Sequence, residues 1–414
     1  MSIIKPFRGF RPKKEYAEKV ASRPYDVLSS DEAREEAKGN SVSFLHVCKP
    51  EIDLDPSIYH YDDSVYAKAV ENWKRLLTNG IFVQDSTPCL YAYRQIMHGH
   101  AQVGLVANSS IEDYFNDVIK KHEYTRPEKE NDRIRHMYEL QCHPEPVFLT
   151  YPDVAELDSI MHTAVSGNPA YDFTADDGIQ HTFWVIDNTE TIRQIQKIFE
   201  QQVPFTYIAD GHHRSAGSAK VGRRMAQENP NHTGNEEYNF FLSVIFPASQ
   251  LMIMDYNRLV VDLNNHSATD FIDKISEKFS IESKGNEVYK PTQLHEFSMY
   301  LNNTWYKLVA KPGTYNDNDP IDVLDVTILS KHILDPLLGI KDQRTDKRID
   351  FVGGIRGLGE LKKRVDSGEM QIAFALYPVS IQQLINIADS GNVMPPKSTW
   401  FEPKLRSGLV VHTF

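Results

Sequence analysis

Cysteines and long apolar runs are both scarce in this sequence. Only Cys48, Cys89 and Cys142 are cysteines among 414 residues, and they lie too far apart for a CxxC metal site or a paired disulfide framework. No segment approaches the roughly 18 consecutive apolar residues that a membrane span needs. The first residues, MSIIKPFRGF, also lack the apolar centre of a signal peptide. We therefore expect a cytoplasmic protein without membrane contact.

Positive charge is also in short supply. Lysine and arginine total 45 against 57 aspartate and glutamate residues, which gives a net charge of -12. A surface of this kind repels the phosphate backbone of nucleic acids, so we do not expect nucleic acid as a partner. Small anions remain compatible with the sequence, because converging donors in a pocket bind them locally whatever the overall charge.

The apolar content, in contrast, is ample for a folded core, since 41% of the residues are hydrophobic. A chain of this length is typical of two or three domains of roughly 100 to 200 residues each. The polar run LNNHSATD is rich in turn-forming residues and marks a boundary. We therefore expect a first domain over residues 1–264 and a second over residues 265–414.

Periodicity and turn signals predict several individual elements. Apolar spacing predicts a helix over residues 64–79. We also expect a charged helix over residues 126–143 and a helix in HEFSMYLNN, residues 295–303. β-Rich runs predict a strand over residues 42–47 and a hairpin that turns at His98-Gly99-His100. Strand and helix signals alternate through much of the chain, which indicates a fold that mixes the two.

The run YIADGHHRSAGSAK, residues 207–220, joins a predicted strand to a predicted helix. Gly211 permits a tight bend after the strand, and the helix pattern is clear from Ser215 onward. The residues between them, His212, His213 and Arg214, therefore fall at or near a helix N-terminus. Backbone N–H groups and the helix dipole attract anions at this place, and an arginine adds a bidentate donor.

Two other interpretations of this turn remain open from the residues alone. The first is an ordinary capped helix whose histidines are satisfied by neighbours. The second is a metal site, which the pattern disfavours because the adjacent His212 and His213 cannot readily share one ion and no HExxH motif or cysteine pair supports them. We therefore expect no metal held by protein side chains alone, although Asp210 can orient a histidine or hold a cation.

The DGHHR turn resembles the phosphate-binding signature of the ParB/sulfiredoxin superfamily, and most of all that of its free serine kinase branch. Over nearly its whole length the chain also looks like a widespread microbial family of unknown function labelled SpoOJ/ParB-like. The motifs that carry this second resemblance are RPYDV (23–27), NSVSFLHVCKPEID (40–53), KKHEYTRP (120–127), ADGHHRSA (209–216) and MPPKSTWFEPKLRSGLV (394–410). The resemblance implies an α+β fold: an elaborated ParB/sulfiredoxin-like mixed sheet with helices, followed by a C-terminal α/β region.

Members of the superfamily differ at this turn. Sulfiredoxins need a cysteine directly before the His-Arg pair, where this chain has a histidine. ParB proteins that partition DNA carry Glu-Arg there and add a helix-turn-helix domain, which this sequence lacks. The resemblance therefore favours the serine kinase branch.

That branch also places a catalytic glutamate in a His-Glu segment upstream of the turn, and His122-Glu123 matches it. The resemblance thus implies that Glu123 is the base, acting with Asp210 and His213, and that His122 contacts the substrate. The residues implied in phosphate binding are Gly211, His212, His213, Arg214 and Ser215. By themselves, Glu123 and its neighbours Arg126, Lys129, Asp132 and Arg133 are equally typical of a solvated, salt-bridged surface.

The loop at Lys397, Ser398 and Thr399 supplies a cation and two hydroxyls after the rigid Pro395-Pro396 turn. It is not a Walker A loop, because the preceding glycines are absent. We interpret it as a substrate-binding loop or as a structural turn, and whether it reaches the site stays open at this point.

Together these motifs favour a kinase that transfers a phosphoryl group to the hydroxyl of free L-serine or a similar small alcohol. Mg²⁺, with ATP, ADP or pyrophosphate as the phosphate donor, would be the cofactor, and Asp210 is its one candidate protein ligand. The alternative is a ParB-like nucleotide-binding regulator without kinase turnover. A homodimer is compatible with the sequence, which leaves the donor, the acceptor and the oligomeric state open.

Overall fold

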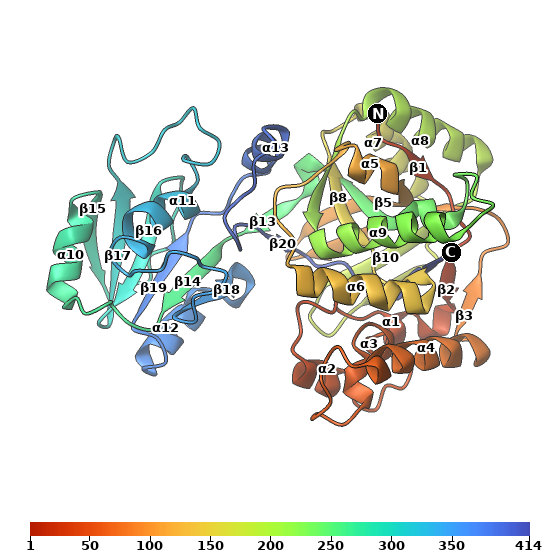
Figure 1. Ribbon diagram of the computed structural model, residues 1–414. Coiled ribbons are helices and arrows are strands. Elements are labelled where there is room, and N and C mark those ends of the chain that lie inside the picture. Colours follow the sequence, from red (N-terminus) through yellow and green to blue (C-terminus); the bar gives the residue numbers. More distant parts are fainter. The chain divides into compact units, whose positions relative to one another are not determined.

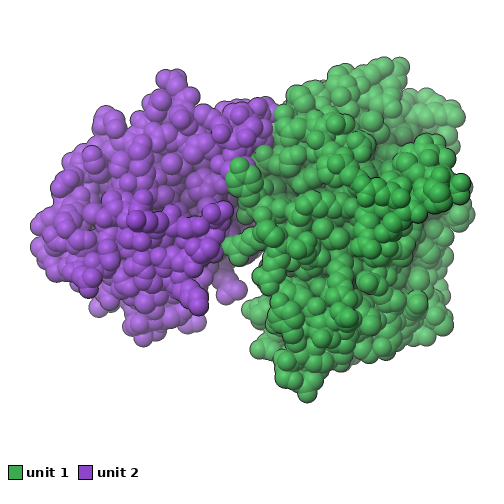
Figure 2. All heavy atoms as spheres, viewed as in Figure 1, with its two compact units in different colours: residues 1–251, 403–414 green, residues 252–402 purple.

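The computed structural model describes all 414 residues, and the chain divides into two compact units. The first comprises residues 1–251 and 403–414, and the second comprises residues 252–402 (Figure 2). The C-terminal segment returns to the first unit because its backbone pairs there, for instance in the bridge between Ser407 and Ser22. This division differs from the predicted boundary at residue 264, because residues 256–260 form a strand inside the sheet of the second unit.

The first unit is built from many short elements around one large sheet (Figure 1). Its strands are β1 (Ile4–Lys5), β2 (Phe10–Pro12), β3 (Phe82–Gln84), β4 (Leu90–Met97), β5 (His100–Ser110), β6 (Ile119–Lys120), β7 (Cys142–His143), β8 (Val147–Tyr151), β9 (Tyr171–Thr174), β10 (Gln180–Ile186), β11 (Thr206–Asp210), β12 (Phe240–Pro247) and β21 (His412–Thr413). Its α-helices are α1 (Ala17–Val20), α2 (Ser30–Glu36), α3 (Leu45–Cys48), α4 (Asp63–Thr78), α5 (Ile111–Phe115), α6 (Pro127–Leu140), α7 (Ala155–Ala164), α8 (Thr189–Gln202) and α9 (His212–Glu228).

The large sheet has nine strands in the order β6-β11-β8-β12-β5-β4-β10-β9, with β1 added beside β5. It is mixed, since β11 is parallel to β6 and β12 is parallel to β8 while the other pairs are antiparallel. The apolar face of α8, with Ile192, Ile195, Ile198 and Phe199, is buried in the same core as Leu149 of β8. Helix α9 packs against β8 and β12 and lies beside α6 (Figure 1).

The second unit has its own sheet of six antiparallel strands, in the order β15-β17-β16-β19-β14-β18. The strands of the second unit are β13 (Met252–Met254), β14 (Tyr256–Val260), β15 (Phe279–Gly285), β16 (Glu296–Leu301), β17 (Thr304–Ala310), β18 (Ile349–Gly353), β19 (Ile372–Leu376) and β20 (Trp400–Glu402). Strands β13 and β20 pair with each other outside the six-stranded sheet. The α-helices of this unit are α10 (Ala268–Ser276), α11 (Asp325–Leu329), α12 (Leu358–Asp366) and α13 (Ile381–Asp389). The mixture of helices and sheets in the two units confirms the expected α+β class.

Several local predictions are confirmed and two are wrong. Helices α4 and α6 and the hairpin of β4 and β5, with its turn at His98-Gly99, form where expected. Residues 42–47 do not form a strand, because Phe44, Leu45 and Val47 are buried by one turn of helix instead. The run HEFSMYLNN contains strand β16 and no helix, since Glu296, Ser298 and Tyr300 alternate with Phe297, Met299 and Leu301, which is the two-residue period of a strand. None of the helices has both the length and the apolar character needed to cross a bilayer.

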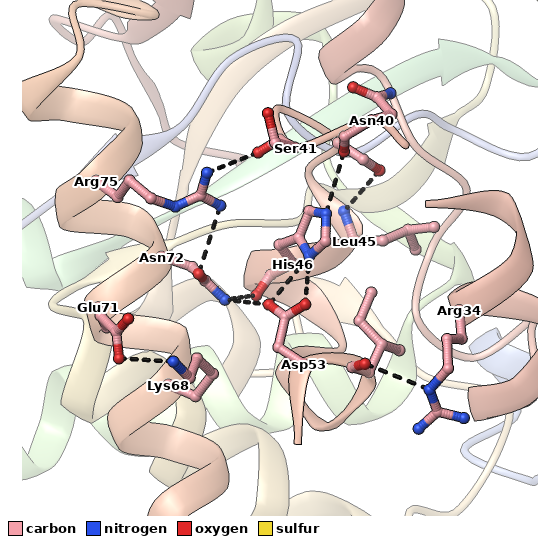
Figure 3. Close-up of polar contacts among 12 residues, drawn as sticks. Arg34, Asn40, Ser41, Leu45, His46, Asp53, Lys68, Glu71, Asn72 and Arg75 are labelled. Carbon is pink, nitrogen blue, oxygen red and sulfur yellow. Dashed lines mark hydrogen bonds and ion pairs between the residues drawn. The ribbon is translucent and has the colours of Figure 1, made fainter. Parts of the chain in front are cut away.

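A polar cluster holds the N-terminal helices together, as Figure 3 shows. The imidazole of His46 pairs with the carboxylate of Asp53 at 2.8 Å, and Asn72 of α4 donates to that carboxylate and to the carbonyl oxygen of His46, each at 2.8 Å. Arg75, one turn further along α4, donates to the carbonyl oxygen of Ser41 at 2.8 Å. The cluster therefore fixes α4 against the turn of helix at residues 45–48.

The close packing of α9 gives a first prediction. A Cβ at Gly222 would collide with the carbonyl oxygen of Tyr238 and lie 2.8 Å from Cδ1 of Ile111. Helix propensity alone favours alanine over glycine by about 1 kcal/mol, but the collision should reverse this preference. We expect Gly222→Ala to lower the free energy of unfolding of the first unit by about 1 to 3 kcal/mol in urea denaturation.

Gly167→Ala is the matched control, because nothing lies within 4 Å of a Cβ at that position in the same unit. It should leave the unfolding midpoint nearly unchanged. Equal stability of the two variants would show that α9 does not pack as closely as the structure indicates.

Candidate functional site

The DGHHR turn joins β11 directly to α9. Gly211 adopts a left-handed conformation, with φ 94° and ψ 35°, which glycine reaches at little cost. The helix begins at His212, three residues earlier than the clear apolar pattern at Ser215 suggests. Asp210 is therefore the last residue of a sheet strand, Gly211 is the cap position, and His212, His213 and Arg214 lie in the first turn of a helix of 17 residues.

The N-terminus of α9 has neither a side-chain cap nor an acidic residue in its first turn. Ser215 does not supply a cap, since its hydroxyl donates to the carbonyl oxygen of Gly211 at 3.0 Å and lies fully buried. A long helix whose first N–H groups meet no side-chain acceptor presents partial positive charge there. The turn is therefore suited to an anion.

Asp210, the last residue of β11, contacts both the backbone of the turn and a lysine from the C-terminal segment. Its Oδ1 accepts the N–H of Gly211 at 2.8 Å, and its Oδ2 lies 2.9 Å from Nζ of Lys404. Burial acts to raise the pKa of this carboxyl, but Lys404 and Arg214 outweigh burial and hold the pKa below its ordinary value. Asp210 is therefore ionised at neutral pH and already engaged by cations.

Lys404 is the site residue that the sequence reasoning missed. It belongs to the C-terminal segment that returns to the first unit, and its own carbonyl oxygen accepts a hydrogen bond from Gln95 of β4 at 2.8 Å. The sequence signal for Lys404 is its place in KLRSGLV, at the end of the last motif.

Arg214 is buried beneath the turn, with 4% of its side chain exposed. It donates to the carbonyl oxygen of Pro146 at 2.6 Å and lies 3.6 Å from Asp26 and 3.8 Å from Asp210. Burial acts to lower its pKa, but these carboxylates outweigh burial and raise it. The guanidinium Nε has no hydrogen-bond partner, so this buried cation retains an unused donor.

His122 and Glu123 lie beside His212 of the turn. The rings of His122 and His212 stand edge to face with centroids 4.4 Å apart. One ligand atom from each of His122, Glu123 and His212 can be chosen so that all three lie within 4.8 Å of one another. Both rings are buried, and burial lowers the pKa of His122 to about 4 and that of His212 well below its ordinary value. Both imidazoles are therefore neutral at pH 7.

His213 faces a different neighbour. Its Nε2 accepts the backbone N–H of Arg126 at 2.9 Å, so the proton of the neutral ring sits on Nδ1. Burial is the main cause of a lowered pKa for this histidine as well. His213 thus fixes the start of α6 against the start of α9.

The charged stretch around Glu123 is not uniformly a solvated face. Arg126 and Lys129 are exposed, but Asp132 and Arg133 are buried and paired at 2.7 Å, and Arg133 lies 3.9 Å over the ring of Tyr25. Lys129, Asp132 and Arg133 line a cavity of about 330 Å³ together with Tyr25, Lys49 and other residues of the N-terminal helices. Tyr25 directly precedes Asp26, so the RPYDV motif connects this cavity to Arg214.

The remaining predicted residues lie in the other unit. The loop with Lys397, Ser398 and Thr399 precedes β20 in the second unit. Ser398 donates to the carbonyl oxygen of Pro395 at 2.6 Å, and the Lys397 ammonium lies over the ring of Tyr256. Both contacts lie within the second unit. The part of this loop in a site with the DGHHR turn stays a prediction.

Comparisons with known proteins give a family and distant structural likenesses. A family model described as a protein of unknown function, DUF1015, matches residues 4–327. This description carries no ParB or SpoOJ label, so that part of the resemblance stays a prediction. No curated protein matches the chain.

Solved structures with a related arrangement are only weakly similar. A conserved hypothetical protein from Pyrococcus furiosus is 14% identical, with a TM-score of 0.35 and coverage of 73% of this chain and 93% of that one. A free serine kinase in complex with AMP is 12% identical, with a TM-score of 0.34 and coverages of 72% and 86%. SbnI with a C-terminal truncation, from Staphylococcus aureus, is 10% identical, with a TM-score of 0.30 and coverages of 72% and 82%. Likeness at this level carries no argument about activity.

The ion pair of Asp210 and Lys404 gives a second prediction. Because the pKa of Asp210 is lowered in the folded state, the stability that it contributes is complete above its ordinary value of 3.8 and is lost as the pH falls toward the lower folded value. Lys404→Met should lower the free energy of unfolding by about 1.5 to 3 kcal/mol at pH 7, the usual range for a charged hydrogen bond. In urea titrations, this difference from the wild type should shrink as the pH falls below about 4.

Lys404→Arg, which keeps the charge, should retain most of the stability. A deficit in Lys404→Met that stays constant from pH 7 to pH 3 would mean that the lysine acts through the packing of its carbon chain and not through Asp210.

Proposed function

The chain belongs to the DUF1015 family of proteins of unknown function, and we propose that it is a phosphotransferase that moves a phosphoryl group to the hydroxyl of free L-serine or a similar small alcohol. The observation that carries the proposal is the convergence of Glu123 with the N-terminus of α9. Its carboxylate lies within 4.8 Å of ring nitrogens of His122 and His212, and His212 is the first residue of that helix. A base and an anion site at one place are what this reaction requires.

The donor phosphates would lie at the N-terminus of α9. The N–H groups of its first turn and the unused Nε of the buried Arg214 are donors for phosphate oxygens. The neutral rings of His212 and His213 add hydrogen-bonding groups without adding charge. ATP, ADP and pyrophosphate all present the same terminal phosphate chemistry to such a turn.

Mg²⁺ would accompany the donor and neutralise its phosphate oxygens. Asp210 is poorly suited to hold the ion directly, because its Oδ1 and Oδ2 already accept from Gly211 and Lys404. We therefore assign Asp210 the role of a positioning residue, which fixes the turn and brings Lys404 to the phosphates. Most ligands of the magnesium ion would then be phosphate oxygens and water.

Glu123 would accept the proton as the substrate hydroxyl attacks phosphorus. In that step the new oxygen–phosphorus bond forms, the bond to the departing phosphate of the donor breaks, and the hydroxyl proton passes to the carboxylate. Removing a general base typically slows a reaction by roughly 10²- to 10⁴-fold. The half-buried position of Glu123 allows the proton to reach solvent afterwards.

This proposal gives the third prediction. The purified full-length chain, incubated with L-serine, Mg²⁺ and ATP, ADP or pyrophosphate, should form phosphoserine, detected by mass spectrometry and ³¹P NMR. Glu123→Gln should lower the rate by roughly 10²- to 10⁴-fold, because glutamine has the same shape but cannot accept the proton. Arg214→Lys should chiefly raise KM for the donor, since lysine loses the planar fork that binds phosphate.

Glu128→Gln is the matched control, because Glu128 is exposed on the same charged segment and its carboxylate meets only the hydroxyl of Tyr59, at 3.4 Å. It should leave the rate unchanged. No phosphorylated product with any donor, across serine and other small alcohols, would refute the proposal. Nucleotide binding without turnover would favour the regulator alternative.

A further inference from the structure

Three metal-binding side chains from two distant parts of the chain converge beside the start of α9. We propose that His122, Glu123 and His212 bind a divalent first-row transition-metal ion. In a tetrahedral site, bonds of about 2.1 Å place two ligand atoms roughly 3.4 Å apart, and the ligand atoms here lie within 4.8 Å of one another. Side-chain movements of roughly 1.5 Å therefore suffice to close the three groups on one ion.

The state of His122 is the independent observation that points to a ligand. Its side chain is 2% exposed, and neither Nδ1 nor Nε2 has a hydrogen-bond partner. A neutral imidazole carries one donor and one acceptor, and a buried polar group without a partner costs about 1 to 3 kcal/mol. A bound cation would use the lone pair of one ring nitrogen and so remove part of this cost.

The second histidine is equally available for coordination. His212 Nε2 accepts a hydrogen bond from the backbone N–H of His122 at 3.5 Å, which is long and therefore weak. An imidazole binds a metal ion in its neutral form, through the lone pair of one ring nitrogen. His213 is not part of the group, because its Nε2 is taken by Arg126.

The donor set decides the class of ion. Two imidazoles and one carboxylate suit Zn²⁺, Fe²⁺, Co²⁺ and their neighbours, whereas Mg²⁺ and Ca²⁺ prefer oxygen ligands. Three protein ligands also leave at least one position open, as in sites where the ion meets a substrate or water. Such a site differs from the Mg²⁺ of a phosphate donor, and it replaces the expectation that protein side chains alone hold no metal.

The inference does not rest on the proposed phosphotransferase. A carboxylate that binds an ion through one oxygen keeps a second oxygen, so Glu123 can serve both roles. One proposal can be refuted while the other stands, because metal binding is measured without substrate or turnover.

The test uses full-length protein, freed of affinity tag and stripped by a chelator, then titrated with Co²⁺. We expect visible d–d absorption that saturates at one Co²⁺ per chain. A second sample, loaded with Zn²⁺ instead, should contain one equivalent of zinc by elemental analysis. His122→Ala and His212→Ala should each weaken binding by at least about 100-fold, the upper end of what loss of a supporting residue costs. Glu123→Gln should weaken binding and shift the absorption bands.

His213→Ala is the matched control and should bind Co²⁺ like the wild type, since that histidine faces Arg126. Circular dichroism establishes that each variant is folded, and His122→Asp, which restores a ligand atom, should recover part of the binding. The proposal is overturned if the wild type binds no Co²⁺, if the spectrum survives in the folded His122 and His212 variants, or if millimolar Mg²⁺ displaces the ion.

Discussion

The left-handed backbone of Gly211 is the constraint on which the candidate site depends. This single residue turns the chain from the end of β11 into the first turn of α9, so the carboxylate of Asp210 lies beside the N–H groups of α9. A side chain at this position would be strained by the backbone conformation and would press on the guanidinium of Arg214. The turn thus needs glycine for two separate reasons.

Burial gives this space its chemistry. The rings of His122 and His212 stay neutral because water is excluded from them, whereas Asp210 and Arg214 stay charged because each has partners of opposite charge. Neutral histidines leave lone pairs for a metal ion or donors for a phosphate, and the retained cations favour an anion. The phosphate and metal proposals therefore draw on the same group of buried residues at the start of α9.

The sequence predicted the local elements wherever one signal dominated. The apolar stripe of α4 and the hairpin turn at His98-Gly99 are such cases, because helix periodicity and turn chemistry act over few residues. Prediction failed at β16, although its residues alternate with the two-residue period of a strand, and where tertiary packing overrode propensity, as in the helical turn at residues 45–48.

For the site, the sequence by itself determined the DGHHR turn and the pairing of His122 with Glu123, since residue types and motif spacing are local properties. Only the tertiary structure decided that Lys404 of the C-terminal segment pairs with Asp210 and that Arg133 lies against the ring of Tyr25. It also decided that His212 contacts His122 while His213 contacts Arg126. These contacts join residues far apart in the chain, and their distances follow from how the sheet and helices pack. No pattern along the sequence encodes that packing directly.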